Sequence, residues 1–106
     1  MSDLSFLTTL EGVIAQRLKD VALHSLPDRP SPSYTVQLAA GGVKKVAQKV
    51  GEEATELAIS AVSEDRERVT AEAADLLYHT LLLLHLRDMR LADVVAELER
   101  RHAERR

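Results

Sequence analysis

The 106-residue chain has no cysteine and no tryptophan, and aromatic residues make up only 3% of it. The absence of cysteine excludes disulfides, thiolate zinc sites and cysteine nucleophiles. Hydrophobic residues still account for 45% of the chain, and most are Ala, Leu and Val, which suit packed helices better than sheets. We therefore predict an all-α fold.

Strong charge and long hydrophobic runs are also missing. The formal net charge is only -3, whereas a nucleic-acid-binding protein normally shows a strongly basic surface. The N-terminus has no basic leader followed by an apolar core, and the longest apolar run, Leu81 to Leu84, is far shorter than the roughly 20 residues that span a bilayer. We expect no nucleic-acid partner, no membrane association and a cytoplasmic location.

The spacing of apolar residues predicts helices along most of the chain. We expect a first helix capped by Asp3, a short helix over 35–40, long helices over 43–62 and from 66 to about 87, and a last helix after Arg90. Three prolines predict a connecting loop over 25–34. In the last helix, the residues expected to face inward are Leu91, Val94, Val95 and Leu98. The expected fold is a bundle of four to five helices in a single domain over 1–106.

The helix expected from residue 66 to about 87 is apolar around nearly its whole circumference. Such a helix is buried within a bundle or in a subunit interface. Because a chain this short buries a small fraction of its surface, we expect a homodimer to complete the bundle.

Two pairs of acids recur at helical spacing, Glu53 with Glu56 and Glu72 with Asp75. Residues three or four apart share one helix face, so each of two helices presents two carboxylates. The second pair lies among Ala and Leu residues, where unpaired carboxylates are costly. Protonation, a basic side chain or a bound metal could compensate them. We favour a metal because the acids outnumber the nearby bases, and oxygen ligands alone indicate Mg²⁺ or Mn²⁺.

A candidate phosphate side precedes the first acidic pair. The helix that follows Gly41 and Gly42 begins with lysines, so free backbone N–H groups and positive charge lie together, as phosphate binding requires. Two glycines are a weak signal, and an ordinary helix break with solvated lysines is the alternative. Lys45, Lys49 and Glu53 then follow at four-residue intervals, which surface ion pairing would also explain.

His79 lies four residues after Asp75, on the same helix face as the second acidic pair. It could contact a phosphate or orient an acid. It could equally be a core histidine that is hydrogen-bonded within the protein.

Three stretches, SYTVQL, GGVKKVAQKVGEEATELA and EAADLLYHTLLLL, resemble phosphoribosyl-ATP pyrophosphatases, a histidine-biosynthesis family in the all-α nucleoside-triphosphate pyrophosphatase (MazG-like) superfamily. The resemblance extends from about Phe6 to Arg101. The superfamily pattern E-E-x-x-E followed by E-x-x-D is matched by Glu52, Glu53, Glu56, Glu72 and Asp75. The resemblance implies Mg²⁺-dependent hydrolysis of the α–β phosphoanhydride of 1-(5-phospho-β-D-ribosyl)-ATP.

The resemblance also implies roles for individual residues. The metal ligands would be Glu53, Glu56, Glu72 and Asp75, and Glu52 would position or deprotonate the attacking water. The residues on the substrate or phosphate side would be Lys45, Lys49, His79, Gly42 and Tyr34. A house-cleaning pyrophosphatase acting on ordinary or damaged nucleoside triphosphates would use the same acids. A non-catalytic dimerisation module with an acidic face is a further alternative, but it leaves the acids of the apolar helix unexplained.

Overall fold

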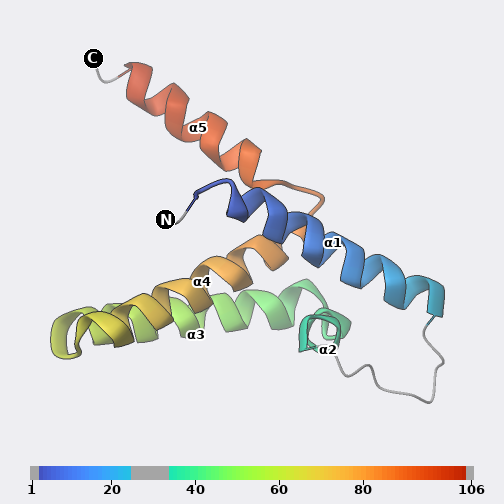
Figure 1. Ribbon diagram of the computed structural model, residues 1–106, viewed down its shortest axis with the longest axis horizontal. Helices are drawn as coiled ribbons and strands as arrows, with labels where there is room; N and C mark the ends of the chain where they lie inside the picture. The colour runs from blue at the N-terminus through green and yellow to red at the C-terminus, as the bar shows by residue number, and fades with distance from the viewer. Residues whose placement is uncertain (1–2, 25–33, 105–106) are drawn as a thin grey trace.

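A computed structural model describes residues 3–24 and 34–104 of the chain. These residues form five helices and no strand, in the order α1 (Phe6–His24), α2 (Tyr34–Ala40), α3 (Gly42–Ser63), α4 (Arg66–Leu86) and α5 (Leu91–Glu104) (Figure 1). The all-α prediction is confirmed. The predicted breaks at Gly41 and Gly42 and at residues 63–65 are also found, but they are narrower, because Gly42 and Ser63 are the first and last residues of α3. The loop predicted over 25–34 lies outside the described residues, apart from Tyr34, which begins α2.

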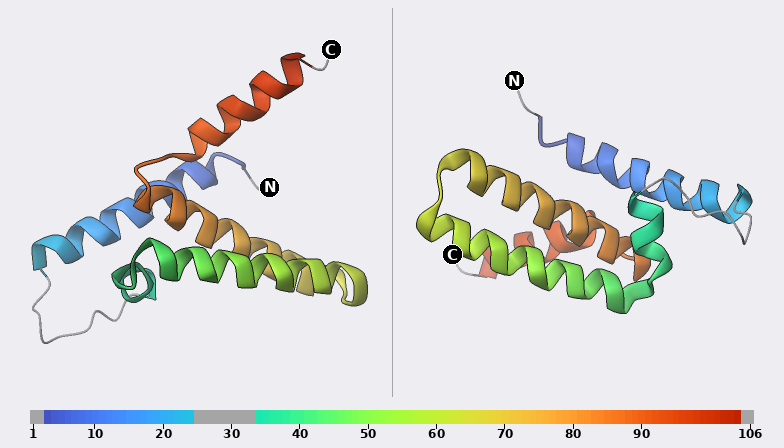
Figure 2. Two further views of the ribbon diagram at one scale, coloured as in Figure 1. Left: turned by 180° about the vertical axis from the view of Figure 1, so that it is seen from behind. Right: turned by 90° about the horizontal axis from the view of Figure 1, so that it is seen from below.

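Helices α3 and α4 run antiparallel, side by side, as one hairpin (Figures 1 and 2). Asp65 begins α4 as its N-cap, since its side-chain Oδ1 accepts a hydrogen bond from the Arg68 N–H at 3.0 Å. At the end of α3 the Glu64 N–H donates to the Ser60 carbonyl at 2.8 Å. This tight connection returns the chain so that the acids of α4 face those of α3.

The core occupies only one end of this hairpin, where α1 and α2 pack against it. Its buried members come from four helices and are Ile14, Leu38, Val46, Leu81 and Leu82. Burial of each Leu or Ile side chain contributes roughly 1.5–3 kcal/mol. The other end of the hairpin, near the turn, is exposed at Ile59 and Val62. The acids of the hairpin therefore lie between a packed end and an exposed end.

The prediction that the apolar residues of the last helix face inward is confirmed for Leu91, which packs against the core, and is wrong for Val95 and Leu98, while Val94 is half-buried. Helix α5 has no buried residue, and Val95 and Leu98 are 44% and 57% exposed. The connection over 87–90 directs α5 away from the hairpin (Figure 1). The start of α5 is instead fixed to α1, because the Leu91 N–H donates to Glu11 Oε2 at 2.7 Å. The described part of the chain leaves most of the apolar face of α5 exposed.

Helix α4 is buried less completely than its composition indicates. Leu81 and Leu82 are buried, whereas Leu77 is exposed.

Among the described residues, no helix combines the length and the apolar character that crossing a lipid bilayer requires.

Candidate functional site

Three carboxylates from α3 and α4 form one cluster. Glu53, Glu56 and Glu72 each offer an oxygen, and these oxygens all lie within 4.8 Å of one another. Glu53 and Glu72 are each only 4% exposed, while Glu56 is exposed. Oxygen ligands at about 2–2.6 Å from one hard cation lie within roughly 5 Å of each other. The hairpin therefore brings together three of the four predicted metal ligands at a separation that suits a cation.

Each of the two buried carboxylates is compensated on one oxygen only. Lys49 Nζ lies 3.4 Å from Glu53 Oε1, and Arg68 Nη2 lies 2.9 Å from Glu72 Oε1. The second oxygens, Glu53 Oε2 and Glu72 Oε2, are buried and have no hydrogen-bond partner among the described residues. Leaving such an oxygen unsatisfied costs about 1–3 kcal/mol or more. A cation bound in the cluster would remove this cost, so the donor set fits a metal.

Asp75, the fourth predicted ligand, does not join this cluster in the described structure. Its side chain is exposed, and it is not among the carboxylates that lie within 4.8 Å of one another. Its backbone carbonyl accepts a hydrogen bond from His79 Nδ1 at 2.6 Å. The pKa of the Tyr34 phenol is raised, mainly by burial, and the negative charges of Glu53 and, to a smaller extent, Asp75 add to this effect. Asp75 therefore borders the site, and its role as a metal ligand stays a prediction.

A cavity of about 250 Å³ adjoins the acids on the side of α2. Four predicted site residues line it, namely Tyr34, Lys45, Lys49 and Glu52. Lys49 links this cavity to the acid cluster, because its Nζ lies 3.8 Å from Glu52 and 3.4 Å from Glu53. The hydrogen bond to Glu53 raises the pKa of Lys49, so the lysine stays cationic at the edge of the cavity.

The two glycines at the start of α3, its N-cap Gly41 and its first residue Gly42, are each required by the local geometry. Gly42 has a φ of +82°, a conformation that residues with a side chain rarely adopt. A Cβ on Gly41 would lie 2.8 Å from Cβ and Cγ of Lys45, which is too close. These glycines allow the chain to turn sharply from α2 into α3. Gly42 is not among the residues that line the cavity, and its contact with a phosphate stays a prediction.

Two adjacent residues of α2 are hydrogen-bonded to two adjacent residues of α4. The Tyr34 hydroxyl lies 2.7 Å from His79 Nε2, and the Thr35 hydroxyl is hydrogen-bonded to the Tyr78 hydroxyl. The rings of Tyr34 and His79 meet edge to face, with centroids 5.7 Å apart. His79 is 5% exposed, and both of its ring nitrogens are engaged within the protein.

Three residues at the site were not singled out by the sequence. Arg68 could have been, because it lies four residues before Glu72 and such pairs meet on a helix face. Thr35 and Tyr78 carry no such signal, since their contact joins positions that are 43 residues apart. That contact depends on how α2 packs against α4.

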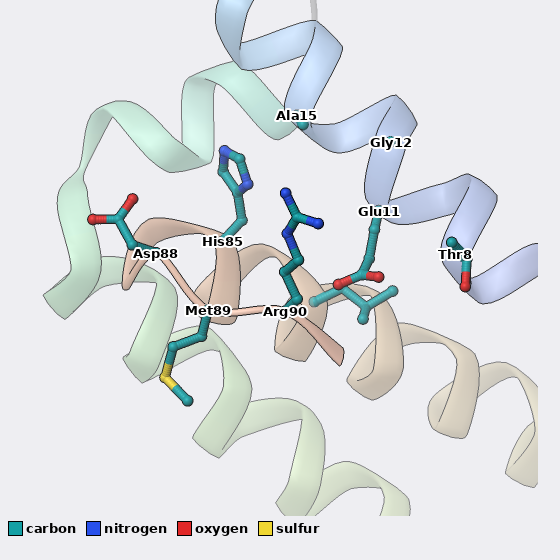
Figure 3. A pocket seen from close by; sticks show the side chains of 9 residues that line it. Thr8, Glu11, Gly12, Ala15, His85, Asp88, Met89 and Arg90 are labelled. Carbon is teal, nitrogen blue, oxygen red and sulfur yellow. The ribbon is translucent and has the colours of Figure 1, made fainter. Parts of the chain in front are cut away.

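A larger cavity, of about 470 Å³, lies between α1 and the connection from α4 to α5 (Figure 3). His85 and Arg90 extend toward α1 there, and Gly12 leaves the facing helix without a side chain. Glu11, on the same wall, is occupied in capping the first residue of α5. None of the paired acids lines this cavity, so the candidate site remains the cluster on α3 and α4.

Comparison with known proteins gives matches over most of the chain. The family model for phosphoribosyl-ATP pyrophosphohydrolase matches residues 15–102. The chain is 47% identical over 88 residues to the phosphoribosyl-ATP pyrophosphatase of Pyrobaculum islandicum, covering 83% of this chain and 94% of that protein. It is 45% identical over 98 residues to the phosphoribosyl-ATP pyrophosphatase of Rhizobium johnstonii, covering 92% of this chain and 84% of that protein.

A third relative is a longer protein, the histidine biosynthesis bifunctional protein HisIE of Yersinia pestis. It is 45% identical over 101 residues, which cover 95% of this chain but only 46% of the relative. The similarity is therefore confined to one part of the bifunctional protein, and it extends across nearly the whole of this chain.

Proposed function

Because the chain belongs to the phosphoribosyl-ATP pyrophosphohydrolase family, we propose that it hydrolyses 1-(5-phospho-β-D-ribosyl)-ATP at the α–β phosphoanhydride. The products are 1-(5-phospho-β-D-ribosyl)-AMP and pyrophosphate, in a step of histidine biosynthesis. The observation that carries the proposal is a pair of buried oxygens, one each from Glu53 and Glu72, that have no partner in the described part of the chain and lie beside a lysine-lined cavity.

The metal we propose is Mg²⁺, for which Mn²⁺ could substitute. Glu53, Glu56 and Glu72 would hold it, and Asp75 would complete the set through a change of side-chain rotamer. When bound, the ion neutralises phosphate oxygens and so makes the anhydride more open to attack by water. The remaining steps depend on groups of the protein.

The remaining site residues have two proposed roles, which are to bind the phosphates and to accept a proton from the attacking water. Lys45 and Lys49 line the cavity beside the acids and would contact the phosphates, while the backbone at Gly42 offers an N–H group at the start of α3. Glu52 lies on the same wall, where the Gln48 side chain donates to its Oε1 at 3.2 Å. We propose that the Glu52 carboxylate acts as the general base and accepts a proton from the attacking water. As the water oxygen bonds to phosphorus, the bridging P–O bond breaks and pyrophosphate leaves beside the lysines.

We further propose that the chain is a single domain in the cytoplasm and acts as a homodimer. The apolar side chains that the single chain leaves exposed on α3, α4 and α5 support the dimer, because a second copy would cover them. These side chains are Ile59, Val62, Leu77, Val95 and Leu98.

A pyrophosphate-release assay tests the proposed activity. The purified protein is given phosphoribosyl-ATP and a panel of ordinary and damaged nucleoside triphosphates, each with Mg²⁺ and with EDTA. We expect Mg²⁺-dependent release that is fastest with phosphoribosyl-ATP. A preference for another triphosphate would instead support a house-cleaning pyrophosphatase, and no release from any substrate would support the non-catalytic dimerisation module.

A further inference from the structure

His79 is placed to direct a hydrogen bond of its neighbour Tyr34. The Asp75 carbonyl can only accept, so His79 Nδ1, 2.6 Å away, must carry the proton of that hydrogen bond. In the neutral imidazole this leaves a lone pair on Nε2. Nε2 lies 2.7 Å from the Tyr34 hydroxyl, so the Tyr34 O–H donates to it. The Asp75 carbonyl therefore fixes the direction of both hydrogen bonds: His79 donates to Asp75, and Tyr34 donates to His79.

This direction decides what Tyr34 can offer to a ligand. Because the hydroxyl proton of Tyr34 is used in the hydrogen bond to His79, the Tyr34 oxygen can only accept a hydrogen bond from a ligand. The tyrosine is 51% exposed and lines the same cavity as Lys45 and Lys49. Burial raises the pKa of the Tyr34 phenol, which keeps the donating proton in place. Tyr34 therefore accepts hydrogen bonds on its cavity side, and phosphate oxygens, which are themselves acceptors, are poor partners for it.

We propose that His79 is a positioning residue, which holds the Tyr34 oxygen toward the cavity as an acceptor for an O–H donor, either a sugar hydroxyl of the nucleotide or the attacking water. This proposal rests on the proposed function. His79 itself does not touch the substrate, because it is 5% exposed and both of its ring nitrogens are occupied. The adjacent contact between Thr35 and Tyr78 keeps α2 in register with α4, so the tyrosine cannot slide away from the histidine.

Three variants separate positioning from a general structural role. Tyr34→Phe removes the acceptor. His79→Asn keeps an amide where Nδ1 lies but has no atom at the Nε2 position, whereas the longer side chain of His79→Gln reaches that position and can accept from Tyr34. His102→Asn, in the exposed last turns of α5, is the matched control. Thermal melts establish that each variant is folded.

We expect Tyr34→Phe and His79→Asn each to lower kcat/KM roughly tenfold, as loss of one hydrogen bond would. Their double variant should lose no more than either one, and His79→Gln should recover most of the activity. Losses that multiply in the double variant would overturn the proposal, because His79 would then act independently of Tyr34. A His79→Gln variant as impaired as His79→Asn would do the same.

Substrates that lack one sugar hydroxyl at a time identify the donor. If the effect of Tyr34→Phe disappears with one of them, that hydroxyl is the donor; if it persists with all of them, the donor is the water. No effect of Tyr34→Phe on any substrate would refute the proposal.

Nitrogen NMR of ¹⁵N-histidine-labelled protein reads the hydrogen-bond chain without any reaction. We expect a protonated Nδ1 and an unprotonated Nε2 at His79, and the reverse tautomer would refute the assigned direction. If the wild type released no pyrophosphate from any substrate, the proposed function would fail, while this measurement would still decide the direction of the hydrogen bond between Tyr34 and His79.

Discussion

Glu72→Gln should raise the stability of the metal-free protein and reduce the further stabilisation that a bound metal gives. At an effective dielectric constant of about 20, two carboxylates 4.8 Å apart repel by about 3.5 kcal/mol, and Glu72 faces both Glu53 and Glu56. The opposing contact joins the buried Glu72 carboxylate to the largely exposed Arg68 guanidinium at 2.9 Å, and a hydrogen bond between charged groups of this kind is worth about 1.5–3 kcal/mol. After a discount for the exposed Glu56, neutralising Glu72 should stabilise the metal-free protein by about 1–3 kcal/mol.

The same substitution removes a ligand of the proposed metal. For the wild type, Mg²⁺ at a hundred times its Kd should add about 2.7 kcal/mol to the free energy of unfolding. For a domain of this size each kcal/mol raises Tm by about 4–8 °C. Thermal melts with EDTA and with Mg²⁺ should therefore show a higher Tm for Glu72→Gln in EDTA and a much smaller gain with Mg²⁺.

The control is Glu99→Gln, which removes the same charge from an exposed position on α5 and should behave as the wild type does. A Mg²⁺-induced gain in Glu72→Gln equal to that of the wild type would refute the metal site. A lower Tm in EDTA would refute the reasoning about repulsion, since Glu72 would then be held mainly by favourable contacts.

Three other side chains, Lys49, Ile14 and Leu98, give further predictions. Lys49→Met should lower kcat/KM at least tenfold in the pyrophosphate assay while the helical circular dichroism is retained, because the lysine faces the proposed phosphates. Since Glu53 raises the pKa of Lys49 above 10.5, their ion pair stabilises the fold below that pH and is lost as pH rises through the folded-state pKa, so the Tm difference between wild type and Lys49→Met should shrink in alkaline melts. Ile14→Ala should cost about 2–5 kcal/mol in urea unfolding because Ile14 is fully buried, whereas Val62→Ala, at an exposed position, should change stability by about 0.5 kcal/mol or less. Leu98→Asp on the exposed apolar face of α5 should convert the proposed dimer to a monomer in light scattering, and an unchanged mass would remove α5 from the interface.

Local sequence patterns predicted the helices and most of the acidic cluster. Three-residue spacing fixes which side chains share a helix face, so the pairing of Glu53 with Glu56 follows from their positions in the sequence. That the acids of α3 and α4 meet across the hairpin also follows from the short connection at residues 64 and 65, because consecutive helices joined by so few residues usually lie side by side.

Contacts that depend on how distant elements pack could not be predicted. The apolar face of α5 was recognised correctly, but periodicity does not say what covers such a face, and the connection over 87–90 turns it away from the core. The hydrogen bond from Tyr34 to His79 joins positions 45 residues apart. It requires a particular crossing of α2 over α4, which no local pattern contains.

Because the core lies at only one end of the hairpin, the two ends of α3 and α4 need not unfold together. No apolar side chain between Glu56 and Glu72 is fully buried, so the turn end of α3 and α4 lacks the packing that closes the opposite end. Segments with little buried apolar surface open at a lower free energy than the rest of a domain. A cation held by carboxylates of both helices would link α3 to α4 and so stabilise this end. Amide exchange in the turn half of the hairpin should therefore slow when the metal binds, while exchange around Val46 and Leu82 stays governed by global unfolding.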